Sequence, residues 1–460
     1  MPPPTSVARP LAPCQVSRNC KDLISLLADD VLLLILSLLD LKEAARTSVL
    51  SKRWRHLWSI LPDYYDFDVS GTWWWRGLMD GQQRKDKLRK FFDYVNQVVS
   101  ASRAPTIDRF RVHIPLVSSR RDDVHTWVEF AMGKSIKELE LDLSNRAGIC
   151  SGVPVWLNSF SRYAQCPSGH TLVSLSLVAV CINDCFLESA LFSFPNLERL
   201  TLRCVHCQHG NFKVVGDSLK LRYLEISFCK DLRKLEISAR NLISVVFNGH
   251  DEDVRFSYVP LLNEASFSGT YARRLIHNFR HISAFSSQLT KLTLSMSYLQ
   301  DIVCHPIKFP HFGNLKQLEL RFMAAINKSL LFFINFIDAC PVLNKFKLQR
   351  MLLQDADVHL PLLENENRVV SYKVHSHLNT FEMVDFLGAK VDTELVLYLA
   401  ELAIALEKVI LYPFQPSPGF GILHRTTRDL VEATEKEAKQ LQNQLPPRVQ
   451  LELATIAHNI

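Results

Sequence analysis

The chain has 460 residues, 47% of them hydrophobic and 22% charged, and its mean hydropathy is +0.03. This composition is typical of a soluble globular protein long enough for more than one domain. The formal charge of +6 is small for this length, so composition gives no reason to expect a nucleic-acid partner. Eleven scattered cysteines do not resemble a dense secreted framework, so we expect a reducing compartment, the nucleus or the cytoplasm.

The most apolar run of the chain lies near its N-terminus and is too short to be a membrane span. Residues Val31–Leu39 supply about nine apolar positions, whereas a transmembrane helix needs about twenty. Asp22, Asp29 and Asp30 precede the run where a signal peptide would carry basic residues. We therefore expect neither export nor membrane insertion. Residues 1–20 are proline-rich and are predicted to be disordered.

A small helical module is predicted to follow this terminus. Asp29 and Asp30 favour a helix start, so Val31–Leu39 should be helical. A second helix is expected over Lys42–Leu50 and a third from Ser51. The three helices make a module over residues 21–67. The chain after it is predicted to be irregular from residue 59 to 84.

A different pattern begins near residue 107, where three apolar positions spaced as L-x-x-L-x-L recur thirteen times. Most units start 20 to 36 residues after the previous one, but two near Leu232 and Leu242 follow after only 11 and 10. The regular spacing is typical of leucine-rich repeats. The units are Ile107/Phe110/Val112, Ile136/Leu139/Leu141, Leu172/Leu175/Leu177, Leu197/Leu200/Leu202, Leu221/Leu224/Ile226, Leu232/Leu235/Ile237, Leu242/Val245/Phe247, Leu262/Ala265/Phe267, Leu289/Leu292/Leu294, Leu315/Leu318/Leu320, Leu343/Phe346/Leu348, Leu378/Phe381/Met383 and Leu406/Val409/Leu411.

The spacing within each unit explains how such repeats build a fold. The last two apolar positions are two residues apart, so both point inward from a short strand and the residue between them points outward. Stacked units then form a parallel sheet on a concave face, with helices and loops on the convex face. We expect an α/β fold: a three-helix module followed by a leucine-rich-repeat solenoid. The alternative is an unrelated α/β domain with scattered strands.

The order of these patterns predicts the domain organisation. The expected parts are a disordered N-terminus (1–20), the helical module (21–67), a linker and helix (68–106), the repeats (107–370), terminal repeats (371–413), and a C-terminal helix with a capping strand (414–460).

Two stretches resemble a known family. ISLLADDVLLLILSLLDLKEAARTSVLSKRWRHLW (24–58) closely resembles the F-box of plant F-box/leucine-rich-repeat proteins. Residues 377–413 resemble the FBD segment that follows the repeats in that family. The resemblance implies a non-catalytic substrate-recognition subunit of an SCF-type (Skp-cullin-F-box) ubiquitin ligase, without cofactor or metal. Its F-box would dock on a Skp-type adaptor, and through it a cullin, while the repeats recruit a protein substrate for ubiquitination.

Two positions depart from the family pattern. Ala28 and Asp40 stand where the family usually carries proline, which would pre-organise the entry to each helix. The alternative is therefore a leucine-rich-repeat scaffold with a degenerate F-box and no ligase assembly.

The predicted adaptor surface comes from the apolar run. Val31–Leu39 is apolar nearly all round, and a three-helix module is too small to enclose it, so a partner should cover one face. The adaptor-binding residues predicted on this basis and from the resemblance are Leu27, Ala28, Val31, Leu32, Ile35, Leu36, Leu39, Val49, Leu50 and Trp54.

The predicted substrate surface is the concave face of the sheet, where solenoids usually bind. Its residues flank the inward apolar pairs and alternate in charge: Arg199, Arg203, Tyr223, Glu225, Lys234, Glu236, Glu319, Arg321, Lys345 and Lys347.

Several cysteines follow the repeat strands. Cys204 and Cys207, with His206 and His209, are residue types that zinc prefers. A cysteine directly after a repeat strand is more simply a small buried side chain, and we expect no metal site here.

Overall fold

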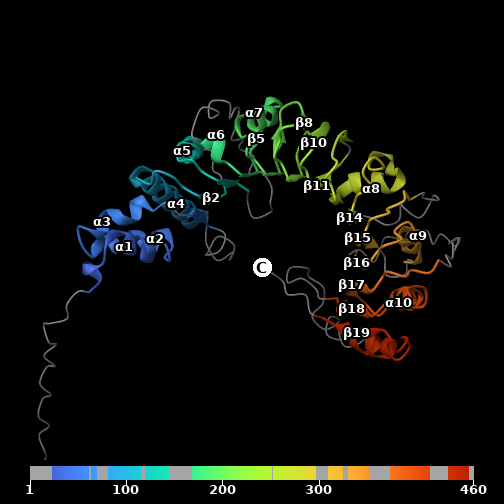
Figure 1. Ribbon diagram of the computed structural model, residues 1–460. Helices are drawn as coiled ribbons and strands as arrows, with labels where there is room; N and C mark the ends of the chain where they lie inside the picture. Colours follow the sequence, from blue (N-terminus) through green and yellow to red (C-terminus); the bar gives the residue numbers. More distant parts are fainter. Residues whose placement is uncertain are drawn as a thin grey trace, which may run out of the picture.

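The chain folds into a curved solenoid with a small helical module at its N-terminal end (Figure 1). The computed structural model describes residues 23–61, 64–69, 81–115, 120–144, 157, 168–250, 252–296, 309–324, 330–352, 373–414 and 434–454. The predicted disordered N-terminus, 1–20, lies outside these ranges. Within them, no helix is both long enough and apolar enough to cross a bilayer.

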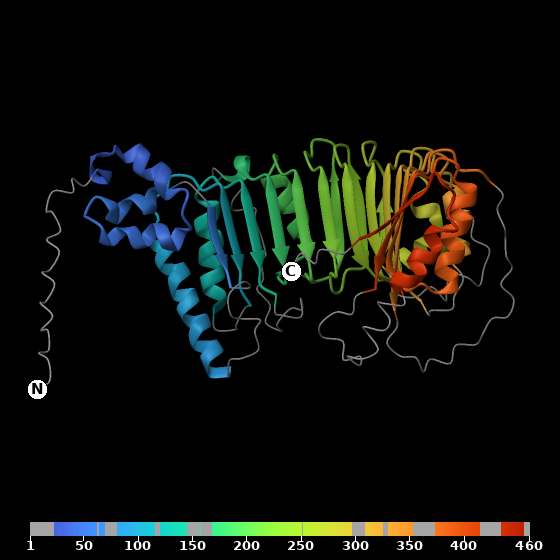
Figure 2. The ribbon, with the colours of Figure 1, turned by 90° about the horizontal axis from the view of Figure 1, so that it is seen from below.

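A single parallel sheet of 14 strands runs the length of the solenoid in chain order (Figure 2). The predicted α/β solenoid is confirmed. The strands are β1 (Tyr64–Asp68), β2 (Arg109–His113), β3 (Glu138–Asp142), β4 (Ser174–Val178), β6 (Arg199–Arg203), β9 (Tyr223–Ser227), β11 (Ser244–Gly249), β13 (Glu264–Ser268), β14 (Lys291–Met296), β15 (Gln317–Ala324), β16 (Lys345–Leu352), β17 (Thr380–Phe386), β18 (Lys408–Pro413) and β19 (Gln450–Leu453).

The helices lie on the outer, convex side of the arc, as expected (Figure 1). They are α4 (Gly81–Ala101), α5 (Arg121–Met132), α6 (Ser168–Thr171), α7 (Cys185–Ser193), α8 (Gly269–His277), α9 (Ile334–Asp338) and α10 (Lys390–Leu402), with a further helical segment at residues 434–442. Two short 3₁₀ helices, η6 (Phe279–His281) and η7 (Leu331–Phe333), adjoin α8 and α9.

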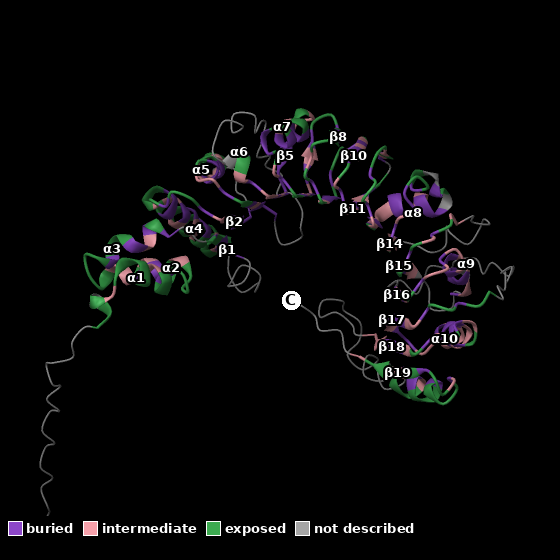
Figure 3. Ribbon diagram, in the orientation of Figure 1, coloured by how far each residue is buried: buried purple, intermediate pink, exposed green. Residues whose placement is uncertain are grey.

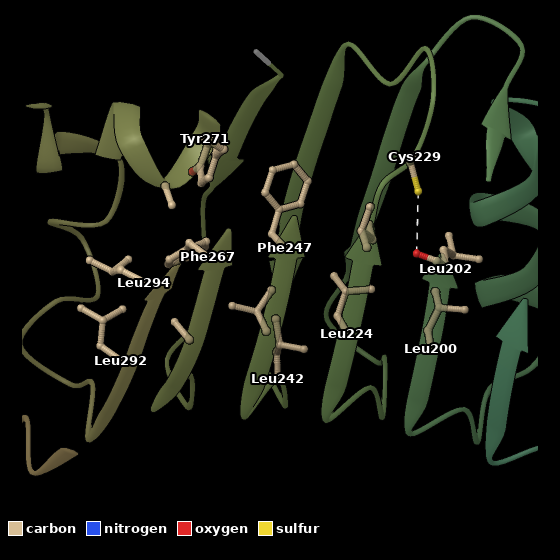
Figure 4. Packing of buried hydrophobic residues seen from close by; sticks show 14 of the residues in the cluster. Leu200, Leu202, Leu224, Cys229, Leu242, Phe247, Phe267, Tyr271, Leu292 and Leu294 are labelled. Atoms are coloured by element: carbon tan, nitrogen blue, oxygen red, sulfur yellow. Dashed lines mark hydrogen bonds between the residues drawn. The ribbon is translucent and has the colours of Figure 1, made fainter. Parts of the chain in front are cut away.

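The inward apolar residues form continuous rows across the sheet. Leu200 pairs in register with Leu224, and Leu202 with Ile226, so each side chain packs against its equivalent on the next strand. These residues are at most 1% exposed. Figure 4 shows the same stacking onward to β14. Since burying one leucine side chain stabilises a fold by about 2 kcal/mol, the repeated rows supply the core of the solenoid.

One predicted repeat unit does not belong to this sheet. Leu235 and Ile237 lie on β10 (Lys234–Ala239), the middle strand of a separate three-stranded sheet with β8 (Asn211–Gly216) and β12 (Asp253–Phe256). This sheet lies on the convex side (Figure 1). The two short steps of 11 and 10 are therefore one unit from Leu221 to Leu242. A strand rises about 3.3 Å per residue against 1.5 Å for a helix, so a short unit crosses the convex side in extended form.

The sheet also begins earlier than predicted. Residues 59–84 were expected to be irregular, but Tyr64–Asp68 forms β1, which pairs with β2 through Tyr65 and Phe110. Tyr65 and Phe67 point inward and are 1% exposed. The first strand thus lies within the range predicted for the helical module, 21–67.

The C-terminal part of the chain extends the sheet by three further strands, β17, β18 and β19. The last strand, β19, lies in the segment where a capping strand was expected and pairs with β18 at the end of the sheet. The segment that resembles an FBD contributes β17, α10 and β18.

A buried ion pair fastens α10 to the preceding repeat. Arg350 on β16 is 3% exposed, and its Nη2 lies 2.8 Å from the carboxylate of Asp392, which is buried in the first turn of α10. The same carboxylate accepts hydrogen bonds from the backbone N–H groups of Leu387 and Ala389 at 3.2 and 3.3 Å. The interaction therefore positions the start of the helix against the sheet.

Replacing one residue of this ion pair should destabilise the fold more than replacing both. We expect Asp392→Leu to destabilise the fold by about 3–5 kcal/mol, because Arg350 would remain buried without its counter-charge. The double variant Arg350→Met, Asp392→Leu should recover much of that loss. Denaturant unfolding of the three proteins measures the difference; a double variant as unstable as the single one would contradict this account.

Candidate interaction surfaces

The N-terminal module is a separate packing unit. It consists of η1 (Ile24–Leu26), α1 (Asp29–Leu36), α2 (Leu41–Arg46), η2 (Thr47–Val49), α3 (Trp54–Leu57) and η3 (Trp58–Ile60). Its own small core is made of Leu32, Leu36, Ala44, Trp54, Leu57 and Leu61. The module thus encloses few of its apolar side chains.

Most of the predicted adaptor-binding residues lie on the outside of this module. Val31, Ile35 and Leu39 on and after α1 are 38–39% exposed. Val49 and Leu50 are 87% and 63% exposed, Ala28 is exposed and Leu27 is half-buried. The outer apolar surface also includes residues that the prediction missed: Leu23, Ile24, Leu26, Leu34 and Leu38. Figure 3 shows the contrast between the exposed module and the buried strands of the solenoid.

Three of the predicted contact residues are wrong. Leu32 and Leu36 are fully buried and Trp54 is 5% exposed, because they form the core of the module. Leu32 and Leu36 are four residues apart and share the inward face of α1. In this fold Leu32 and Leu36 offer no exposed surface to a partner, and Trp54 offers very little.

The start of α1 is held in the conformation that a proline would impose. Ala28 precedes the helix with φ −68° and ψ 158°, and Leu27 before it is also extended. Arg53 donates from Nη2 to the carbonyl oxygen of Leu27 at 2.5 Å and pairs with Asp29 at 2.7 Å. Arg53, which directly precedes α3, thus holds the residues that lead into α1 in place.

Asp40 likewise has a structural role of its own. It precedes α2 with φ −65°, and its Oδ1 accepts a hydrogen bond from the backbone N–H of Glu43 at 2.7 Å. This is an N-cap, which a proline could not provide. Asp40 also lies near α4, where burial and the Asp40 charge raise the pKa of Tyr94 to about 12.

The module contacts the N-terminal end of the solenoid. The backbone N–H of Arg103 donates to the carbonyl oxygen of Ser59 at 2.7 Å. Tyr65 on β1 and Ser102 after α4 share a hydrogen bond of 2.8 Å. Trp58 packs against both cores. The Ser59 hydrogen bond and the packing of Trp58 join the module to the first repeats, while the Tyr65–Ser102 bond ties β1 to the end of α4.

Four of the predicted substrate residues form one connected group on the concave face. The guanidinium of Arg199 lies 4.3 Å from the centre of the Tyr223 ring. The hydroxyl of Tyr223 donates to Glu225 at 2.8 Å, and Arg203 pairs with the same carboxylate at 2.5 Å. Burial and the hydrogen bond to Glu225 raise the pKa of Tyr223 to about 12. The group links β6 to β9.

A second group lies further along the face. Glu319 on β15 pairs with Arg321 at 2.8 Å and with Lys347 on β16 at 3.5 Å. Lys345 pairs with Glu382 on β17 at 2.6 Å. Charges of opposite sign on adjacent strands therefore neutralise one another, as cross-strand pairs do.

Lys234 and Glu236 do not belong to this face, so their prediction is wrong. They lie on β10 in the convex sheet and approach each other to 3.9 Å. The error follows from the repeat unit that was assigned to the main sheet.

The cysteines at the strand ends fill the interior. Cys181, Cys207 and Cys229 are 4–7% exposed, and Cys229 donates a hydrogen bond to the carbonyl oxygen of Leu202 at 3.7 Å (Figure 4). A hydrogen bond with Cys229 and burial raise the pKa of the Cys207 thiol. In the part of the chain that the structure describes, no three His, Cys, Asp or Glu side chains are grouped to hold a metal ion.

The concave face also carries a hollow that the sequence did not predict. It has a volume of about 720 Å³ and lies over β11, β13 and β14. We call it the central hollow. Tyr223 and Phe228 border it on one side, and Glu319, Arg321 and Met323 on the other.

Comparisons with known proteins agree with both parts of this architecture. The F-box domain model matches residues 24–66, and the model described as At1g61320/AtMIF1, LRR domain, matches residues 106–442. The F-box/LRR-repeat protein At3g18150 of Arabidopsis thaliana is 26% identical over 330 residues, 66% of each chain. The F-box/LRR-repeat protein At3g58880 is 30% identical over 55% of this chain and 59% of its own length.

A third Arabidopsis relative extends further. The FBD-associated F-box protein At5g56390 is 25% identical over 421 residues, which cover 86% of this chain and 92% of that protein. Across the first two relatives, by contrast, the chain spans about two thirds of their length or less.

The backbone at Ala28 predicts that proline is tolerated there. Its φ of −68° matches the proline ring, and none of the hydrogen bonds found among the described backbone groups uses its N–H. We expect Ala28→Pro to raise the free energy of unfolding of the module by about 0.4–1 kcal/mol, because it restricts the unfolded chain. Thermal unfolding would measure this.

The matched control is Asp40→Pro. It has a compatible φ but loses the cap on Glu43, worth about 1 kcal/mol, so it should not stabilise the module. A lower unfolding midpoint for Ala28→Pro than for the parent chain would contradict the account of this loop.

Proposed function

Because the chain belongs to the plant F-box/leucine-rich-repeat family, we propose that it is a substrate-recognition subunit of an SCF-type ubiquitin ligase. In this proposal the N-terminal module docks on a Skp-type adaptor and thereby joins a cullin. The concave face of the repeats holds a protein substrate. The subunit does no chemistry of its own and acts in the nucleus or the cytoplasm.

The observation that carries the proposal is the exposed apolar surface of the module. Val31 and Ile35 on α1 and Val49 on η2 are between 38% and 87% exposed, although they are fully apolar. Exposed apolar side chains gathered on a small unit are characteristic of a protein-binding surface. Each square ångström of apolar surface that a partner removes from water contributes about 25 cal/mol to the free energy of binding.

The mechanism that fits this arrangement is proximity. A subunit that holds an adaptor at one end and a substrate on its concave face turns ubiquitin transfer into an effectively intramolecular event. Its contribution is the raised effective concentration of the substrate near the loaded enzyme.

The alternative is a repeat scaffold whose F-box has decayed. The alanine at position 28 and the aspartate at position 40 favour it, since the family usually has proline at both. Against it, both residues have backbone angles suited to proline, and Arg53 and the Asp40 cap supply the constraint by other means. The docking conformation therefore does not require the two prolines.

Adaptor binding tests the proposal directly. We expect the purified full chain to bind a Skp-type adaptor, and Ile35→Asp or Val49→Asp to weaken the dissociation constant at least about tenfold, or 1.4 kcal/mol. The reason is that each variant would bury a carboxylate without a partner in an apolar interface. Isothermal titration calorimetry would measure the constants.

The matched control is Phe192→Asp on α7. Phe192 is 82% exposed on the convex side, so this variant adds the same charge away from the module and should bind normally. Thermal unfolding should show the folded state intact in all three variants. Absence of binding by the parent chain at micromolar concentration, or full binding by both module variants, would overturn the proposal.

A further inference from the structure

The floor of the central hollow is made of short side chains. On β11, β13 and β14, the residues that point to the concave face are Ser244, Val246, Asn248, Glu264, Ser266, Ser268, Lys291, Thr293 and Ser295. Only Glu264 and Lys291 carry a charge in this set, and they lie together at the N-terminal ends of their strands. The middle and far parts of the floor offer hydroxyl, amide and methyl groups.

Two carboxylates on the strands that flank the floor, Glu225 on β9 and Glu319 on β15, already have partners. Glu225 is held by Arg203 and Tyr223 on one side. Glu319 is held by Arg321 and Lys347 on the other. At these two borders a ligand therefore meets charges that are already paired. Glu264 and Lys291, of opposite sign, stand side by side at one end of the floor, and His250 lies at the other end, after β11. A charged ligand group over the middle of the floor would lose its water without gaining a counter-charge, which is unfavourable.

Phe228, at the border of the hollow, has an unfavourable backbone conformation. Its φ is +54°, in the left-handed region that bulky side chains rarely adopt. Three smaller residues at the corresponding ends of other strands also have positive φ: Ala179, Cys204 and Gly269. Among these four positions, only Phe228 carries an aromatic ring.

The ring of Phe228 is also poorly buried. The residue is 60% exposed, whereas Ala179 at the equivalent position is 6% exposed. Strain in the backbone and an exposed aromatic side chain both reduce the stability of the isolated chain. The recurring turn accounts for the positive φ, but the 60% exposed ring is not needed to fill the interior and is available for a contact outside the chain.

We infer that the central hollow is the substrate site, and that it takes an extended, uncharged peptide segment with one apolar side chain against Phe228. The inference rests on the proposed function and names its substrate class. The volume of about 720 Å³ falls in the range of ligand-binding pockets. Hydroxyl and amide groups of the floor suit the backbone and the small polar side chains of such a segment, and the exposed ring suits an apolar anchor.

A random peptide library displayed on phage provides the probe, with the full chain bound to its adaptor, or the free chain, as the target. We expect enriched peptides to be uncharged with one large apolar residue. Phe228→Gly should weaken binding of an enriched synthetic peptide at least tenfold. Its thermal unfolding midpoint should stay equal or rise, because glycine adopts positive φ freely. A purely structural role for Phe228 would instead lower the midpoint and leave peptide binding unchanged.

A pair of valine variants separates the hollow from the rest of the surface. Val246→Glu places a charge on the floor and should abolish peptide binding. Val215→Glu makes the same change on β8, where Val215 is 49% exposed on the convex sheet, and should bind normally. Fluorescence polarisation with the labelled peptide would measure both.

The outcomes distinguish this inference from the proposed function. Enrichment of acidic or basic peptides, enrichment of none, or peptide binding unaffected by Val246→Glu and Phe228→Gly overturns the hollow as the site, even if the adaptor binds. Failure to bind the adaptor, with uncharged peptides still captured in the hollow, overturns the ligase role and supports the same site in a scaffold.

Discussion

The structure depends on one constraint, the hydrogen-bonded register of a parallel sheet. Adjacent strands lie about 4.8 Å apart, so each turn of the chain places its residues directly beside those of the previous turn. Inward positions such as Leu200 and Leu224 become a row of the core, and outward positions become a row of the concave face. The charged groups and the hollow on the concave face therefore both depend on which residue types occupy equivalent outward positions in successive repeats.

The same register explains why the concave face is divided into zones. Where successive outward residues are long and opposite in charge, as at Glu319 and Lys347, they pair across strands and neutralise one another. Where they are short, as at Val246, Ser266 and Thr293, the face is hollow. The N-terminal module is organised differently, because it has no strand register. Its three short helices enclose a core of six residues, and the remaining apolar side chains stay outside.

Sequence patterns predicted the repeats well because each unit buries its own apolar positions locally. Twelve of the thirteen units lie in the main sheet, and the exception is informative. Leu235 and Ile237 have the same two-residue alternation as the other units, and alternation alone does not tell which of two sheets a strand joins. The buried positions of α1 were also assigned too broadly. Its sequence is apolar nearly all round, so only the three-dimensional packing distinguishes Leu36, which is buried, from Ile35, which is exposed. The positive φ of Phe228 depends on a turn that most of its neighbours make with small residues, and no residue type in the sequence marks it.

The two interaction surfaces share a thermodynamic feature. Exposed Val49 on the module and exposed Phe228 beside the hollow each leave apolar area in water, which lowers the stability of the free chain. A solenoid tolerates such losses because its core is a sum of repeats, and the cost at one position is small against rows that extend over 14 strands. The module has a core of only six residues, so it has much less stabilising burial to offset such losses. Its contacts to the first repeats through Ser59 and Trp58 therefore add support from the solenoid to a module that leaves many apolar side chains exposed.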